Sequence, residues 1–173
     1  MEVIVQSQLA IAAIMITTSM SSAAFGQTQI PLCDFVTRVV AARANDFASI
    51  RGPEEELLGA KTGLYVGKLS PGPTAKCSVG RDKGTVSYIC NYDSAESMAA
   101  MKPIYERYRA DLVKCYSDIS FDDGTRGSEE KHNEQWFVAG QNAQVKLTLS
   151  ASNLAYINKN KPALLQLSIR SLP

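Results

Sequence analysis

Four cysteines behind an apolar N-terminal segment constrain the fold of this chain more than any other feature. They are Cys33, Cys77, Cys90 and Cys115. Exported proteins commonly oxidise an even set of cysteines to disulfides, whereas cytosolic proteins keep their thiols reduced. The cysteines therefore indicate a disulfide-stapled protein of an oxidising compartment, either periplasmic or secreted.

The N-terminal segment has most features of a signal peptide. Its strongest apolar part, residues 9–16, has the length of a signal-peptide core and is shorter than the roughly 20 apolar residues that span a bilayer. Small residues follow, although Glu2 stands where basic residues usually precede the core. We expect residues 1–26 to be a signal peptide, residues 27–173 to form a single domain, and no membrane insertion after cleavage. Cleavage before Phe25, an uncleaved membrane anchor and a cytosolic apolar tail are the alternatives.

The charge of the chain excludes some partners. All 18 basic residues follow position 26, and Glu2 is the one acidic residue of 17 before it, so the mature chain carries a net charge near +2. Nucleic-acid-binding proteins usually show a far larger basic excess. We therefore expect no nucleic-acid partner.

The spacing of apolar residues predicts two helices. From residue 32 to residue 50 they recur at mostly three or four positions, and the following residues 51–53 (Arg-Gly-Pro) are typical of a helix end. We expect a short helical turn at 54–58. Residues 93–96 are typical of the start of a second helix, which Pro103 should kink or split.

The segment between Cys77 and Cys90 has the pattern of a β-hairpin. If residues 83–84 (Lys-Gly) form a two-residue turn, the two cysteines face each other at a non-hydrogen-bonded position, where side chains come closest. A three-residue loop would shift the pairing by one residue and break this match. The two-residue register also places Val79, Val86 and Tyr88 on the cysteine face, whereas the apolar Ile89 is an exception on the other face.

The C-terminal third alternates apolar and polar residues, as a half-buried antiparallel sheet does. The alternation covers residues 144–150 and 163–171, residues 135–139 are a third strand-like run, and residues 64–69 could add a strand. Residues 117–133 are polar and predict a loop. The fold class expected is α+β: an antiparallel sheet of about five to six strands, with two main helices packed on one face.

Two disulfides follow from this arrangement. Cys33 opens the first predicted helix and Cys115 closes the second, so antiparallel helices on one sheet would bring them together. We therefore predict Cys33–Cys115 and Cys77–Cys90, one of the three pairings that four cysteines allow. Free thiols in place of one or both bridges are the alternative.

No catalytic or metal-binding motif accompanies these cysteines. The cysteines are too far apart in the sequence for a zinc site or a Cys-x-x-Cys redox site, and His132 is the one histidine. A Gly-x-Ser-x-Gly nucleophile elbow is missing from the sequence. We therefore expect no enzyme activity, no metal and no cofactor.

Candidate binding residues are polar or aromatic residues in segments that should be exposed. Arg51 could hold an anion or a carboxylate, although a cation at a helix C-terminus is the simpler interpretation. His132 could be a general base or a solvated loop histidine. The acids near Gly124 could take calcium, but their spacing is not that of an EF-hand, and a solvated turn explains them. The full set is Arg51, Asp122, Asp123, Glu129, Glu130, His132 and Trp136.

The chain resembles small exported bacterial proteins of unknown function between Cys33 and Cys115. The resemblance depends on Cys33 itself, on Phe47-Ala-Ser-Ile-Arg-Gly52, on Ser87-Tyr-Ile-Cys90 and on Val113-Lys-Cys115, and it implies no catalytic motif. In size and element order the chain is also similar to periplasmic immunity or inhibitor proteins.

These observations lead to one main hypothesis and two alternatives. We expect a small exported binding module that acts on another protein of the cell envelope, as an inhibitor, an immunity-like factor or an envelope accessory. Its contact surface would be the predicted loop at 117–133 or the exposed sheet face. The alternatives are a carboxylate-dependent hydrolase, which would use acids such as Asp122 and Glu134, and a membrane-anchored structural component of an envelope assembly.

Overall fold

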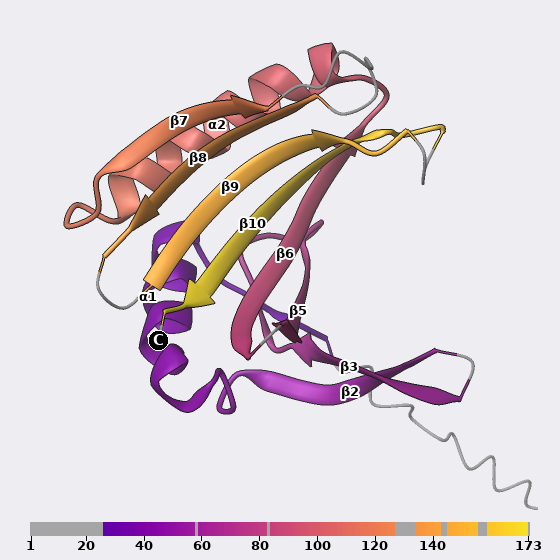
Figure 1. Ribbon diagram of the computed structural model, residues 1–173, viewed down its shortest axis with the longest axis vertical. Helices are drawn as coiled ribbons and strands as arrows, with labels where there is room; N and C mark the ends of the chain where they lie inside the picture. Colours follow the sequence, from indigo (N-terminus) through magenta and orange to yellow (C-terminus); the bar gives the residue numbers. More distant parts are fainter. Residues whose placement is uncertain are drawn as a thin grey trace, which may run out of the picture.

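The chain forms a large antiparallel sheet with two long helices (Figure 1). A computed structural model describes residues 26–57, 59–82, 84–126, 134–142, 145–155 and 159–172. Within these residues the sheet has eight strands in the order β2-β3-β5-β6-β10-β9-β8-β7. The expected α+β class is confirmed, but the expected five to six strands were too few.

The strands of the sheet are β2 (Arg51–Leu57), β3 (Ala60–Gly67), β5 (Lys76–Asp82), β6 (Thr85–Ala95), β7 (Phe121–Arg126), β8 (Gln135–Gln141), β9 (Val145–Asn153) and β10 (Ala163–Ser171). The helices are α1 (Leu32–Ala42), a short 3₁₀ turn η1 (Arg43–Asn45) and α2 (Met98–Cys115). Two short strands, β1 (Thr28–Gln29) and β4 (Leu69–Ser70), form a separate parallel pair.

The molecule consists of two halves with the same order of elements. In the first half α1 precedes β2, β3, β5 and β6, and in the second half α2 precedes β7, β8, β9 and β10. The four strands of each half lie side by side in the sheet, in the order of the sequence. The last strands of the two halves, β6 and β10, pair antiparallel at the centre of the sheet. The sequence shows no internal repeat, so this duplication of topology is visible only in the fold.

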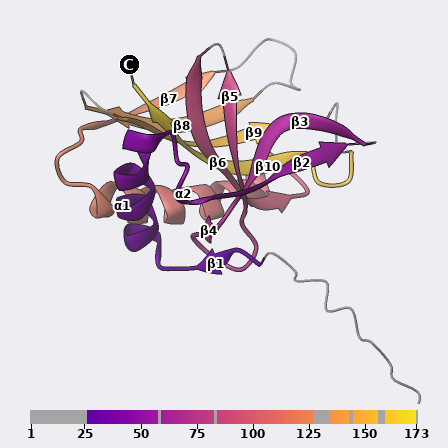
Figure 2. The same ribbon diagram turned by 90° about the horizontal axis from the view of Figure 1, so that it is seen from below.

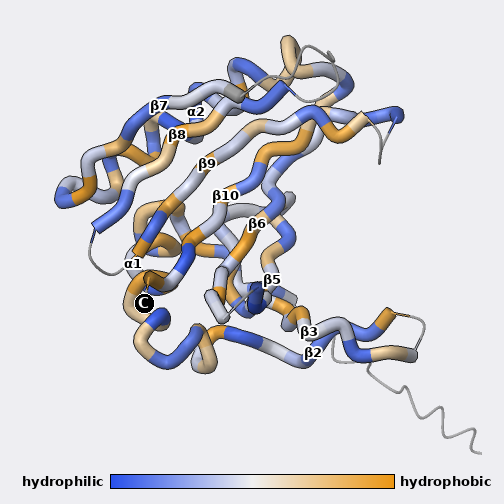
Figure 3. Tube along the Cα trace, viewed as in Figure 1, coloured by the Kyte–Doolittle hydropathy of each residue, from blue (hydrophilic) through white to orange (hydrophobic). Residues whose placement is uncertain are grey.

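One face of the sheet carries the core, and both helices cover that face (Figure 2). Phe35 of α1 packs its ring 5.8 Å from that of Tyr88, and Tyr105 of α2 packs 6.1 Å from Trp136. The strand registers place Tyr88 and Trp136 on the same face of the sheet. Hydrophobic positions recur along β9 and β10 (Figure 3). The residues of these strands that face the core are at most 1% exposed: Val145, Leu147, Leu149, Ala151, Ala163, Leu165, Leu167 and Ile169.

Both predicted disulfides are confirmed. Cys33–Cys115 joins the start of α1 to the end of α2, and Cys77–Cys90 crosses the hairpin of β5 and β6. The predicted register of that hairpin is also confirmed, since Cys77 pairs with Cys90 and Asp82 pairs with Thr85. A two-residue loop therefore connects the strands. Its second residue, Gly84, has a φ of 85°, which glycine adopts without steric cost.

The prediction for residues 32–58 was wrong beyond Ala42. The helix stops there, and after η1 the chain turns through Asp46 and Phe47, whose φ angles are 53° and 60°. Arg51 then opens β2, so residues 51–53 are not a helix end and the described part of 54–58 is strand rather than helical turn. Apolar spacing continued past the helix because Phe47, which is fully buried, reaches the core from the turn.

The second helix begins later than predicted and is not split. β6 continues to Ala95, and Ser97 caps α2 by accepting a hydrogen bond from the backbone N–H of Ala100 at 3.1 Å. The helix passes through Pro103 without a break. Met101 and Tyr105, on either side of Pro103, are both buried and hold the two parts of the helix on the same sheet face.

A strand replaces part of the predicted loop at 117–133. Phe121–Arg126 forms β7, which pairs with β8. The Asp-Asp-Gly sequence has turn character on its own, but Phe137 of β8 covers Gly124, where an added Cβ would lie 2.0 Å from the Phe137 ring. Pairing with a neighbouring strand thus overrides the local propensity.

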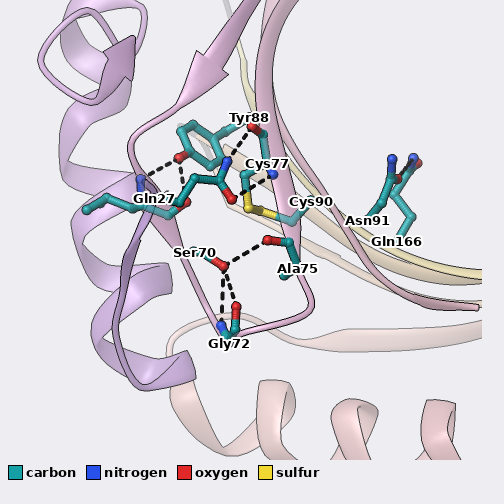
Figure 4. The surroundings of a disulfide bond; sticks show 10 residues. Gln27, Ser70, Gly72, Ala75, Cys77, Tyr88, Cys90, Asn91 and Gln166 are labelled. Carbon is teal, nitrogen blue, oxygen red and sulfur yellow. Dashed lines mark hydrogen bonds between the residues drawn. A yellow bond between two sulfur atoms is a disulfide. The ribbon is translucent and has the colours of Figure 1, made fainter. Parts of the chain in front are cut away.

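The disulfide of the hairpin lies among hydrogen bonds that tie it to the N-terminal part of the chain (Figure 4). The Tyr88 hydroxyl donates to the carbonyl of Leu69 at 2.8 Å and accepts from its N–H at 3.0 Å. Burial raises the pKa of Tyr88 to about 12. The Gln27 amide donates to the Cys77 carbonyl at 2.7 Å and accepts from the Cys77 N–H at 3.3 Å. The short β1–β4 pair is thereby fixed to the main sheet.

Of the two long helices in the described ranges, neither is long and apolar enough to cross a membrane. The predicted signal peptide, apart from Gly26, lies outside the described residues.

Candidate binding groove

A groove of about 750 Å³ lies between α2 and the strands β7 and β8. We call it the α2–β7 groove. Its walls come from one face of the helix, from β7, and from β8 with the residue before it. The lining residues are Lys102, Tyr105, Glu106, Arg109, Asp123, Gly124, Thr125, Glu134, Trp136 and Phe137.

Two aromatic side chains form an apolar part of the groove. Trp136 is partly exposed, and its ring lies 6.1 Å from that of Tyr105, which is 7% exposed. Val138, two residues further along the same face of β8, is fully buried. Trp136 therefore lies at the edge of the core, with one side packed on the helix and another open to the groove. Burial, and to a smaller extent the charge of Asp123, raises the pKa of Tyr105 to about 12, so its hydroxyl stays protonated at neutral pH.

An ion pair connects the two walls of the groove. Arg109 on α2 donates through Nε to Asp123 Oδ1 at 2.6 Å and through Nη2 to Asp123 Oδ2. This two-pronged contact holds the pKa of the Asp123 carboxyl below its usual range and raises that of Arg109. Asp123 therefore carries its charge at neutral pH. The pair connects β7 with α2 across the groove.

This geometry does not favour acid–base chemistry in the groove. A carboxylate-dependent hydrolase needs two convergent acids, of which one has a raised pKa and acts as the proton donor. The pKa of Asp123 is shifted the other way, and Arg109 occupies both of its oxygens. Asp122 directly precedes Asp123 in β7, so its side chain points to the opposite face of the sheet. Within the described residues, no group of three or more His, Cys, Asp or Glu side chains could hold a metal ion.

The structure divides the predicted site residues. Asp123 and Trp136 meet in the α2–β7 groove, whereas Arg51 lies at the start of β2, at the other end of the sheet. Asp122 is exposed on the face away from the helices. The remaining three predicted residues lie outside the described residues: Glu129, Glu130 and His132.

The prediction missed the helical wall of the groove. Lys102, Tyr105, Glu106 and Arg109 follow the spacing i, i+3, i+4 and i+7, which places them on one face of α2. That spacing is present in the sequence and could have identified a mixed aromatic and charged face. Nothing in the sequence indicated which strand would lie opposite this face, because β7 was expected to be a loop.

Comparisons of the chain with protein-family models, with curated proteins and with solved structures found no match. The fold and the groove therefore define the class: an α+β protein with two disulfides, built from two topologically equivalent halves, with an aromatic groove beside one edge of its sheet. Its function has to be argued from that groove.

Proposed function

We propose that the protein is an exported, disulfide-stabilised binding module that recognises another protein of the cell envelope through the α2–β7 groove. The observation that carries the proposal is the partly exposed Trp136 in a groove with charged walls. Tryptophan, tyrosine and arginine provide most of the binding energy in protein interfaces, and this groove presents all three types.

The position of the groove suits an extended partner segment. In the described part of the chain β7 has a single neighbour, β8, and so forms one edge of the sheet. An edge strand presents backbone N–H and C=O groups to which another strand can pair. A partner strand added to β7 would form main-chain hydrogen bonds and could place a side chain over Trp136.

The charge of the groove indicates what kind of partner side chain would bind over Trp136. The acids Glu106, Asp123 and Glu134 outnumber the bases Lys102 and Arg109. A cationic side chain gains from this negative excess and from the faces of aromatic rings. We therefore propose that the partner segment carries a lysine or an arginine at this position.

Export supports a partner in the envelope. Two disulfides are compatible with an oxidising compartment, and the apolar N-terminal segment is typical of a signal peptide. An inhibitor, an immunity-like factor and an envelope accessory would all use such a surface. Mass spectrometry of the N-terminus of the exported protein distinguishes a cleaved leader from the membrane-anchored alternative.

The test is capture of envelope proteins on the immobilised mature chain, followed by affinity measurement with the captured partner. Loss of a tryptophan at the centre of an interface weakens binding by about 30-fold, so we expect Trp136→Ala to lose the partner. Arg170→Ala, on an exposed position of the opposite sheet face, is the matched control and should retain it. Equal affinity of both variants for the partner would contradict the assignment to the groove.

A further inference from the structure

A second pocket lies at the opposite end of the sheet from the α2–β7 groove. It has a volume of about 430 Å³ and is formed by β2, β3, the β5–β6 hairpin and the turn after η1. We call it the arginine pocket. Its chemistry comes from Asp46, Arg51, Tyr65 and Arg81, and Gly80 and Gly84 contribute backbone.

Arg81 is held in place within this pocket. Its Nη2 donates to Asp46 Oδ2 at 2.7 Å, and its Nη1 donates to the Gly84 carbonyl at 3.3 Å. A guanidinium has five N–H donors, so these two contacts leave others for a ligand. A cation already oriented by the protein loses less freedom when it binds an anion.

The turn that presents Asp46 is fixed by the core. Asp46 and Phe47 both have positive φ angles, 53° and 60°, and a bulky residue such as phenylalanine rarely adopts that conformation. Phe47 is fully buried, and its ring packs 5.9 Å from that of Tyr88. Burial of Phe47 thus holds the turn in place, and the turn positions Asp46 against Arg81.

Arg51 provides a second cation of a different kind. Its guanidinium carbon lies 4.6 Å from the centroid of the Tyr65 ring, so the group stacks on the ring. Arg51 takes part in none of the ion pairs recorded among the described residues. The alternative interpretation of Arg51, a cation at the end of a helix, is wrong because the residue opens β2.

We infer that the arginine pocket binds a carboxylate, which Arg51 and Arg81 contact together. Two arginines against one aspartate leave a single positive charge, which matches the single negative charge of a carboxylate. Arginine donors suit the two oxygens of that group. A phosphate dianion would meet the same cations, but its repulsion by Asp46 would be twice that of a carboxylate because it carries twice the charge. This inference does not depend on the proposed function of the α2–β7 groove.

The test is a titration of the mature protein with small ligands, in which the NMR signals of the Gly80 and Gly84 amides report binding. N-acetylglycine is the carboxylate probe, N-acetylglycinamide is its neutral analogue, and inorganic phosphate is the third ligand. We expect saturable shifts with N-acetylglycine at roughly millimolar concentration, as for a ligand of few atoms, and none with the amide. Absence of saturable shifts would overturn the site, and tighter binding of phosphate would overturn the carboxylate assignment.

Variants separate a local site from general attraction to a basic protein. Arg51→Gln should weaken N-acetylglycine binding by about 10-fold, because one charged donor is lost. Arg38→Gln removes the same charge from the exposed face of α1 and should leave binding unchanged. The proposal would be contradicted if both variants weakened N-acetylglycine binding equally, or if neither variant weakened it.

A third variant tests the charge argument. Asp46→Asn keeps an oxygen that Arg81 can bond but removes the negative charge, so the affinity for phosphate should rise by a larger factor than the affinity for N-acetylglycine. An equal rise for both ligands, or no rise for phosphate, would overturn the charge argument. Circular dichroism melting of each variant checks that it is folded.

Discussion

The two halves of the molecule share a topology but are stabilised by different interactions. In the second half, β9 and β10 each bury an unbroken series of alternate apolar residues under α2. In the first half, β2 and β3 are largely exposed, and Leu57 near the end of their hairpin is 67% exposed. The hairpin disulfide and the hydrogen bonds of Tyr88 lie in this half.

The difference shows how one topology can be supported in two ways. A strand with continuous apolar alternation gains enough from burial to hold its place. In the first half the outer strands β2 and β3 lack this alternation, and the disulfide Cys77–Cys90 and the Tyr88 hydroxyl add specific cross-links to the inner strands β5 and β6 and to Leu69. The disulfide Cys33–Cys115 belongs to neither half, because it joins α1 to α2.

Removal of the disulfide between the halves should have the largest effect. Its cysteines are 82 residues apart, and the chain-entropy relation for a loop of that length gives a loss of about 4.5 kcal/mol in the free energy of unfolding. Cys33 is exposed, so serine fits there without strain. Urea denaturation of Cys33→Ser/Cys115→Ser measures the loss. A cost below that of the hairpin disulfide would contradict the loop-length argument.

The hairpin disulfide should contribute less. Its cysteines are 13 residues apart, which predicts a loss of about 3 kcal/mol. Both cysteines are buried, so Cys77→Val/Cys90→Val keeps an apolar pair of similar size in their place. The same urea experiment compares this variant with the serine pair. If the first half depends on this cross-link, hydrogen exchange should increase in β5 and β6 and remain unchanged in β9 and β10.

Gly67 tests the close packing beneath Tyr88. A Cβ at this position would lie 2.4 Å from the Tyr88 hydroxyl, so Gly67→Ala should push the ring away and cost about 1–3 kcal/mol. Gly72→Ala is the matched control because a Cβ added there would meet no atom within 4 Å, and it should change stability by less than about 0.5 kcal/mol. Thermal unfolding of both variants gives the comparison, and equal melting temperatures would show that the Tyr88 contacts do not constrain β3.

The smallest effect is expected for the ion pair of the second half. Arg109 and Asp123 are partly exposed, so their contact contributes about 0.2–1 kcal/mol. Because the folded-state pKa of Asp123 is lowered, this contribution is present above the ordinary carboxyl pKa of about 3.9 and disappears as the pH falls through the lower folded value. Urea denaturation should therefore separate the natural chain from Asp123→Asn at pH 7 and not in strong acid. Asp122→Asn removes a carboxylate on the other sheet face, outside this ion pair, and is the matched control.

Part of the fold was predictable because the signals are local. The register of β5 and β6 follows from a two-residue turn and the facing positions of Cys77 and Cys90, and the boundaries of β10 follow from its alternation. Two strands of the large sheet were missed, β2 and β7, because they lack such alternation and form by pairing with a neighbour. Of the α2–β7 groove, Asp123 and Trp136 were predicted, whereas Tyr105 and Arg109 were not.

The sequence by itself determined the α+β class, both disulfide pairings and the core face of the central strands, because each depends on spacing along one segment or on the ends of two helices. Only the tertiary structure decided the equivalence of the two halves, the edge position of β7 and the separation of Arg51 from Trp136. The physical reason is that strand pairing depends on the partner strand as much as on the strand itself. The four cysteines that most constrain the sequence therefore support two surfaces, the α2–β7 groove and the arginine pocket, whose residues meet only when the sheet is assembled.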